Sequence, residues 1–136
     1  MFGSKKAKQQ AEQAAQVAVR TYDDLLRRYC QSAPRYVSAN RDRLYEGLQL
    51  SHSEFQALDL ALAGAIALRA AQWQLPKMLK LELGDYARNV DGEVIQSVVG
   101  STTSTALALY LPGIDLNLVG VCLRDERFGD IDLNRV

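Results

Sequence analysis

The longest run of apolar residues lies in the middle of the chain and predicts a buried helix over residues 53–75. Between Phe55 and Trp73, apolar residues recur at three- and four-residue spacing, and the opposite side of the same helix is also apolar. The uncharged stretch between Asp59 and Arg69 is nine residues long, whereas a membrane span needs about 20. We therefore expect a core helix and no membrane contact.

Local signals mark both ends of this helix. Ser51 and Glu54 form the S-x-x-E pattern of a capping box, in which a serine hydroxyl accepts from a free backbone amide; Ser53 is an alternative cap. Pro76 predicts the end of the helix, because the residue before a proline is pushed out of the helical region. Gly64 leaves room in the middle for a close packing partner.

Two further helices are expected before the central one. Residues 4 to about 31 combine strong helix formers with a stripe that is thin in alanine at first and bulky later. Ser32 and Pro34 then predict a break and a second helix over about 34–48. The polar first half of the long helix can bury little alone, so we expect it to fray or to pack against another helix, including one from a second copy. The candidate self-association residues are Ala7, Ala11, Ala14 and Ala18.

The region after Pro76 predicts β-structure. Residues 77–83 could continue as a helical turn or become a strand, and the alternation of leucine with charge at 79–83 favours the strand. Residues 105–111 and 114–123 alternate between apolar and polar positions, and Pro112-Gly113 separates these two segments. Residues 93–99 fit either a helix or a strand. The predicted fold class is α+β: an N-terminal bundle of about three helices with the central helix buried, and a C-terminal antiparallel β-hairpin or small sheet packed on it.

Length and composition are those of one globular domain. The chain has 136 residues, of which 48% are hydrophobic and 24% charged, so it can bury a substantial core. We expect a single domain over residues 1–136, with a polar helical extension at 1–20 and a charged C-terminal tail at 124–136.

Charge is balanced overall but divided between the two halves. Residues 1–50 hold nine Lys/Arg against five Asp/Glu, and residues 51–136 hold seven against eleven. This division suits an anionic partner for the first half, or head-to-tail self-association of basic and acidic surfaces. Two differently charged solvated faces would give the same numbers.

The compartment indicated by the sequence is the cytoplasm. The first 16 residues contain lysines but no apolar segment of a secretory signal. Cys30 and Cys122 are the two cysteines, and without export they are expected to remain reduced thiols.

The first half also interleaves arginines with tyrosines. Tyr22, Tyr29 and Tyr36 fall seven residues apart, each with an arginine nearby; arginine can neutralise phosphates and tyrosine can stack on bases. The alternative is that the tyrosines pack between helices, and Pro34 is expected to break the spacing into two helices. The candidate contacts for a polyanion or an acidic partner are Lys5, Lys6, Lys8, Arg20, Arg27, Arg28, Arg35 and Arg43.

No motif for a chemical reaction is recognisable. His52 lies at a helix start without an identifiable nucleophile or orienting carboxylate, so we expect a surface residue near the cap. Cys30 and Cys122 have no local catalytic signature and are expected in the core, and the chain lacks the spacing of a zinc site. The sequence therefore predicts no catalytic residue, metal, cofactor or small-molecule substrate.

These observations predict a non-enzymatic assembly or adaptor protein that acts through protein–protein contacts and self-associates as a homo-oligomer. A prokaryotic or phage-like assembly component would fit. The alternative is binding of nucleic acid or another polyanion through the basic Arg/Tyr half.

Overall fold

The computed structural model describes residues 2–84, 92–128 and 131, and within these ranges the side chains of residues 2–8, 10, 11, 94 and 127 are not described. Every regular element in the described part of the chain is a helix. In chain order the elements are α1 (Phe2–Ala39), α2 (Arg41–Leu44), α3 (His52–Leu83), α4 (Gly92–Tyr110), α5 (Leu116–Arg124) and the short 3₁₀ helix η2 (Glu126–Phe128).

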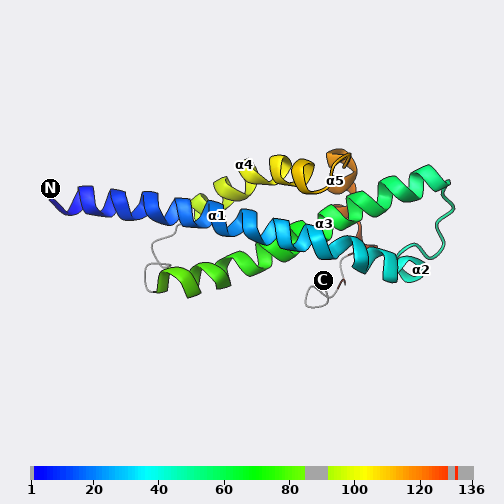
Figure 1. The fold of residues 1–136 in the computed structure, drawn as a ribbon, viewed down its shortest axis with the longest axis horizontal. Coiled ribbons are helices and arrows are strands. Elements are labelled where there is room, and N and C mark those ends of the chain that lie inside the picture. The colour runs from blue at the N-terminus through cyan, green and yellow to red at the C-terminus, as the bar shows by residue number, and fades with distance from the viewer. Residues whose placement is uncertain (1, 85–91, 129–130, 132–136) are drawn as a thin grey trace.

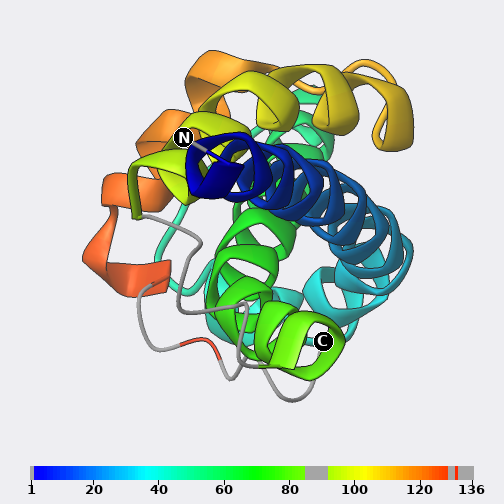
Figure 2. The same ribbon diagram turned by 90° about the vertical axis from the view of Figure 1, so that its left-hand side faces the viewer.

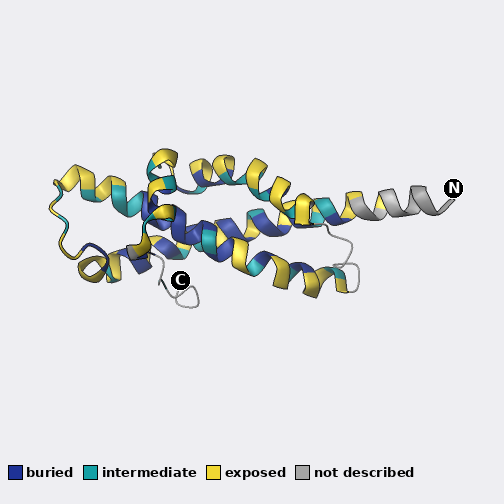
Figure 3. Cartoon of the chain, turned by 180° about the vertical axis from the view of Figure 1, so that it is seen from behind, coloured by how far each residue is buried: buried dark blue, intermediate teal, exposed yellow. Residues whose placement is uncertain are grey.

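The fold is built around the long pair α1 and α3. α3 runs back along α1 in the opposite direction, and α4 packs on another side of α1 (Figures 1 and 2). α5 closes against α3. Buried residues form a band along the facing sides of these helices, visible as dark blue in Figure 3. The central helix predicted at 53–75 is thus confirmed as a core helix, and its main neighbours are α1 and α5.

The predicted C-terminal β-hairpin, and with it the α+β fold class, is wrong. Residues 105–110 lie in α4 and residues 116–123 lie in α5. No strand occurs among the residues that the structure describes. Alternation was misleading because Leu107 and Leu111 are also four apart, on one helical face, and both are buried, whereas Leu109 is 66% exposed. Alanine and leucine are strong helix formers, so propensity favours the helix.

The turn predicted at Pro112-Gly113 exists, but it joins two helices. Gly113 has φ of 86°, in the left-handed region that glycine adopts without strain. Asp115 then caps α5, with its carboxylate accepting from the backbone amides of Asn117 at 3.0 Å and Leu118 at 3.3 Å. This region therefore has no edge strand to which a strand of a partner protein could add.

The predicted break at Ser32 and Pro34 is also wrong, because α1 continues through Pro34 to Ala39. The separate helix expected at 34–48 is reduced to the four residues of α2. A proline inside a helix costs about 3 kcal/mol. Tyr36 and Val37 are buried just beyond it, and burial of such side chains contributes about 1.5–3 kcal/mol each, enough to keep the helix intact.

The same balance explains the second proline. Pro76 lies inside α3, which runs on to Leu83, so neither the predicted stop nor the strand at 79–83 is found. Leu75 and Leu79 on either side are both fully buried. At the other end the prediction holds: Ser51 is the N-cap, and its hydroxyl accepts from the Glu54 amide at 3.3 Å. The ambiguous segment 93–99 is helical, within α4.

Gly64 is a point of close approach in α3. A β-carbon added there would collide with the end of the Ile114 side chain and would contact Val119 and Leu111. The space left by the glycine is therefore filled by side chains of the α4–α5 corner, rather than by another backbone. None of the helices in the described ranges is long and apolar enough to cross a membrane.

Candidate functional site

The first part of α1 extends beyond α3 and α4 as a single helix (Figure 1). We call residues 2–13 the N-terminal arm. Gln9, Glu12 and Gln13 are exposed, and burial begins at Ala14, which is 6% exposed, and Ala18, which is fully buried. Half of the proposed self-association stripe is thus covered by the protein's own helices.

The other half of that stripe, Ala7 and Ala11, lies in the arm. Their side chains are outside the described set, but the backbone of α1 gives the angular positions of the two residues around the helix. At about 100° per residue, both lie within about 20° of the direction of Ala18. The stripe of the arm therefore continues the face with which α1 packs on its own neighbours, at a level where the other described helices have ended.

The tyrosines of the first half are packing residues. α1 is continuous, so Tyr22, Tyr29 and Tyr36 share one face after all; Tyr22 and Tyr36 are buried and Tyr29 is half-buried. The Tyr22 hydroxyl lies 2.8 Å from that of Thr103, and burial raises the pKa of Tyr22. Tyr45 is buried as well. The buried rings cannot stack on nucleic-acid bases.

Most of the candidate arginines have partners within the chain. Arg20 pairs with Glu82 at 3.5 Å and Arg27 with Asp24 at 3.4 Å. The Arg43 guanidinium donates to the Tyr36 hydroxyl at 2.9 Å. The candidate lysines Lys5, Lys6 and Lys8 lie in the first turns of α1, where side chains are not described.

Part of the charge division between the two halves is satisfied internally. The basic helix α1 packs on α3, which belongs to the acidic half, and the Arg20–Glu82 pair joins them. Arg41 of α2 pairs with Asp59 of α3, and the Tyr45 hydroxyl donates to the same carboxylate at 2.7 Å. Burial, and then the neighbouring Asp59, raise the pKa of Tyr45. Because these charges are paired within the chain, the unequal charge of the two halves is weaker evidence for a charged partner than the sequence alone suggested.

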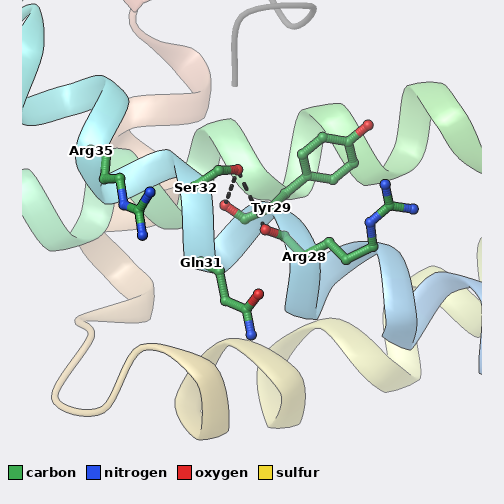
Figure 4. A pocket seen from close by; sticks show the side chains of 5 residues that line it. All are labelled: Arg28, Tyr29, Gln31, Ser32 and Arg35. Atoms are coloured by element: carbon green, nitrogen blue, oxygen red, sulfur yellow. Dashed lines mark hydrogen bonds between the residues drawn. The ribbon is translucent and has the colours of Figure 1, made fainter.

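A polar depression of about 360 Å³ lies on α1, and two of the candidate arginines line it. Arg28 and Arg35 flank it, with Gln31 and Ser32 between them and Tyr29 beside them (Figure 4). The Ser32 hydroxyl donates back to the carbonyl oxygens of Arg28 and Tyr29, both at 3.4 Å. A second depression, of about 270 Å³ and more apolar, lies where α1, α2 and the start of α3 meet, beside the Arg41–Asp59 pair.

The other titratable candidates are placed as the sequence predicted. Cys30 and Cys122 are free and buried, and burial raises their pKa values to about 12 and about 11. Thiolate, the reactive form, is therefore disfavoured at both. His52 is exposed at the start of α3, with its Nε2 atom 3.2 Å from the Gln56 amide nitrogen.

Two polar contacts that organise the fold were not anticipated. Arg69 of α3 donates to the carbonyl oxygens of Leu123 and Phe128, and so ties the end of α5 and η2 to the core. The Tyr110 hydroxyl of α4 lies 3.0 Å from both carboxylate oxygens of Asp23 on α1. Phe128, within the tail expected at 124–136, is buried. These contacts join residues 54 to 87 positions apart, which sequence spacing cannot reveal.

No cluster of three or more potential metal ligands occurs in the part of the chain that was described. Comparison of the chain with protein-family models, with curated proteins and with solved structures gives no match. The features that bear on function are therefore its own: the N-terminal arm, and the depression at Arg28 and Arg35.

Proposed function

We propose that the protein is a non-enzymatic assembly protein that self-associates through its N-terminal arm. One observation carries the proposal: α1 continues past its packing partners, and positions 7 and 11 have nearly the same helical phase as the buried Ala18. Alanines on that stripe allow a second helix to approach closely, because they add little bulk between the two backbones. The buried cysteines suit a reducing, cytoplasmic setting.

The expected association is weak and depends on concentration. An arm of twelve residues is about 18 Å long, and its alanines offer little apolar area. Such a contact falls below the roughly 1,000 Å² of a stable interface. Residues 2–13 contain three lysines and one glutamate, so the arm favours an acidic surface of the second copy over a second arm. Added salt should then weaken the association.

Paired substitutions on opposite faces of the arm test the proposal. Ala7→Glu with Ala11→Glu places two carboxylates on the stripe, whereas Gln9→Glu with Gln13→Glu adds the same charge about 140–180° away. A carboxylate buried without a partner costs more than about 1.4 kcal/mol, a factor of ten in affinity. We expect the first pair to weaken self-association at least about tenfold relative to the second. Equal effects of the two pairs would contradict the proposal.

Nucleic-acid binding through the Arg/Tyr half is the weaker alternative. Of its stacking residues Tyr22 and Tyr36 are buried and Tyr29 is half-buried, and Arg20, Arg27 and Arg43 each have a partner within the chain. Failure of both a duplex and a single strand to bind at low salt would exclude it, because phosphate contacts are strongest there.

A further inference from the structure

The depression flanked by Arg28 and Arg35 is rich in hydrogen-bond donors. Its described lining contains two guanidinium groups, the Gln31 amide and two hydroxyl groups, and no carboxylate. Of these groups only the Ser32 hydroxyl is used within the described chain, where it donates to backbone carbonyl oxygens. The other donors of the lining can therefore form hydrogen bonds with a ligand that carries acceptor atoms.

Arg28 and Arg35 differ from the arginines around them. Arg20, Arg27 and Arg41 each form an ion pair and Arg43 donates to a tyrosine. Neither Arg28 nor Arg35 has a side-chain hydrogen bond or ion pair among the described residues, and both are exposed. No hydrogen bond or ion pair with another described residue has to break before these two side chains bind a ligand.

Their spacing places both charges on one side of α1. Seven residues correspond to about 10.5 Å along the helix and a rotation of about 20°. The Arg35 side chain is directed along α1 toward Ser32, whereas that of Arg28 extends the other way in Figure 4. Because arginine is long and these two are unrestrained, rotation about its side-chain bonds can bring the Arg28 guanidinium toward Ser32.

We propose that this depression is a binding site for a phosphate dianion, either inorganic phosphate or the terminal phosphate of a monoester. Two guanidinium groups match two negative charges, and the planar fork of arginine donates to two phosphate oxygens at once. The site is exposed and screened by salt, so the dissociation constant is on the order of millimolar. The proposal does not depend on self-association, since no residue of the arm takes part.

Asp24 carries a negative charge that repels such a ligand. It lies one turn before Arg28 on the same helix and pairs with Arg27 at 3.4 Å. Its charge opposes a phosphate bound next to Arg28. Asp24→Asn should therefore strengthen phosphate binding by about two- to fivefold.

Inorganic phosphate is the probe for the test, titrated into ¹⁵N-labelled full-length protein at constant ionic strength. Backbone amide signals of residues 28–33 and of Arg35 are expected to shift and to saturate. Arg28→Ala with Arg35→Ala should weaken binding at least about tenfold. Arg27→Ala is the matched control, because Arg27 is adjacent and exposed but already paired, and it should change affinity by less than about twofold.

A monoester, methyl phosphate, should bind as inorganic phosphate does. Dimethyl phosphate and acetate carry one charge each and should bind several-fold more weakly. The proposal is overturned if phosphate causes no saturable shift at residues 28–35, if Arg27→Ala acts like the double variant, or if dimethyl phosphate or acetate binds as tightly as phosphate.

Discussion

The guanidinium of Arg69 donates to the backbone carbonyl oxygen of Phe128 across 2.9 Å, and so ties η2 to the middle of α3. The same side chain also reaches the carbonyl oxygen of Leu123 at the end of α5. Hydrogen bonds from charged groups contribute about 1.5–3 kcal/mol. Arg69→Ala should therefore lower the free energy of unfolding by about 2–3 kcal/mol in urea denaturation. Arg28→Ala, which removes an exposed arginine without a partner in the described chain, should change it by less than about 0.5 kcal/mol; a similar loss in both variants would contradict this role of Arg69.

The hydroxyl groups of the buried Tyr22 and the half-buried Thr103 join α1 to α4. Tyr22→Phe leaves the ring in the core and removes the hydrogen bonds of its hydroxyl, to Thr103 and to Gln72, so we expect a loss of about 1 kcal/mol. Tyr29→Phe is the control, because the half-buried Tyr29 hydroxyl has no hydrogen bond to a described residue, and its effect should lie within about 0.5 kcal/mol of zero. Thermal or urea unfolding measures both, and equal effects would show that the hydrogen bonds of the Tyr22 hydroxyl contribute nothing to stability.

Gly64 and Ile114 are predicted to be energetically coupled. Gly64→Ala gains about 1 kcal/mol of helix propensity but puts a methyl group against the end of the Ile114 side chain. Ile114→Val removes the atom in the way. In a double-mutant cycle the two substitutions together should be more stable than additivity predicts, by about 1 kcal/mol. Additivity within about 0.3 kcal/mol would mean that Ile114 moves aside without cost.

Stability should fall at alkaline pH because of the buried thiols. Burial raises the pKa of Cys30 to about 12 and that of Cys122 to about 11, from 9.0 for the free group. Above pH 9 the unfolded chain therefore loses thiol protons that the folded chain retains, and folding becomes less favourable as pH rises. Each thiol contributes up to about 1.4 kcal/mol per pH unit between its unfolded and folded values.

Single Cys30→Ala and Cys122→Ala variants test this linkage. Each should flatten the decline of the unfolding free energy between about pH 9 and pH 10 relative to the parent, whatever its effect at neutral pH. A slope unchanged in both variants would show that the thiols ionise as readily in the folded protein as in the unfolded chain.

Local signals that agree with tertiary packing were readable from the sequence. Ser51 capping α3 and the uncharged stretch before Arg69 both led to the central core helix. Pro34 and Pro76 misled because their local cost is smaller than the burial gained beside them by Tyr36 and Leu79.

The C-terminal region misled for a different reason. Leucines at every second position also include pairs four apart, so periodicity over seven residues fits a strand and a helix equally well. Asp115, three residues before Leu118, was the capping signal that favoured a helix.

The basic surface and the alanine stripe of α1 could be predicted only in part from the sequence. The sequence showed that the first half is basic and that its alanines form a stripe. Which charges remain for a partner depends on tertiary contacts such as Arg20 with Glu82, 62 positions away in the sequence, and only the fold shows that Ala14 and Ala18 are already buried.

The central claim is that residues 2–13 hold copies of the protein together. Sedimentation equilibrium of the full chain and of a variant lacking residues 2–13 tests it most directly, because this deletion spares Ala14 and the core beyond it. The full chain should exceed its monomer mass of 15.1 kDa increasingly with concentration from micromolar to millimolar, while the shortened chain stays monomeric and folded. A full chain that remains a monomer throughout this range, or a shortened chain that associates equally well, would contradict the account.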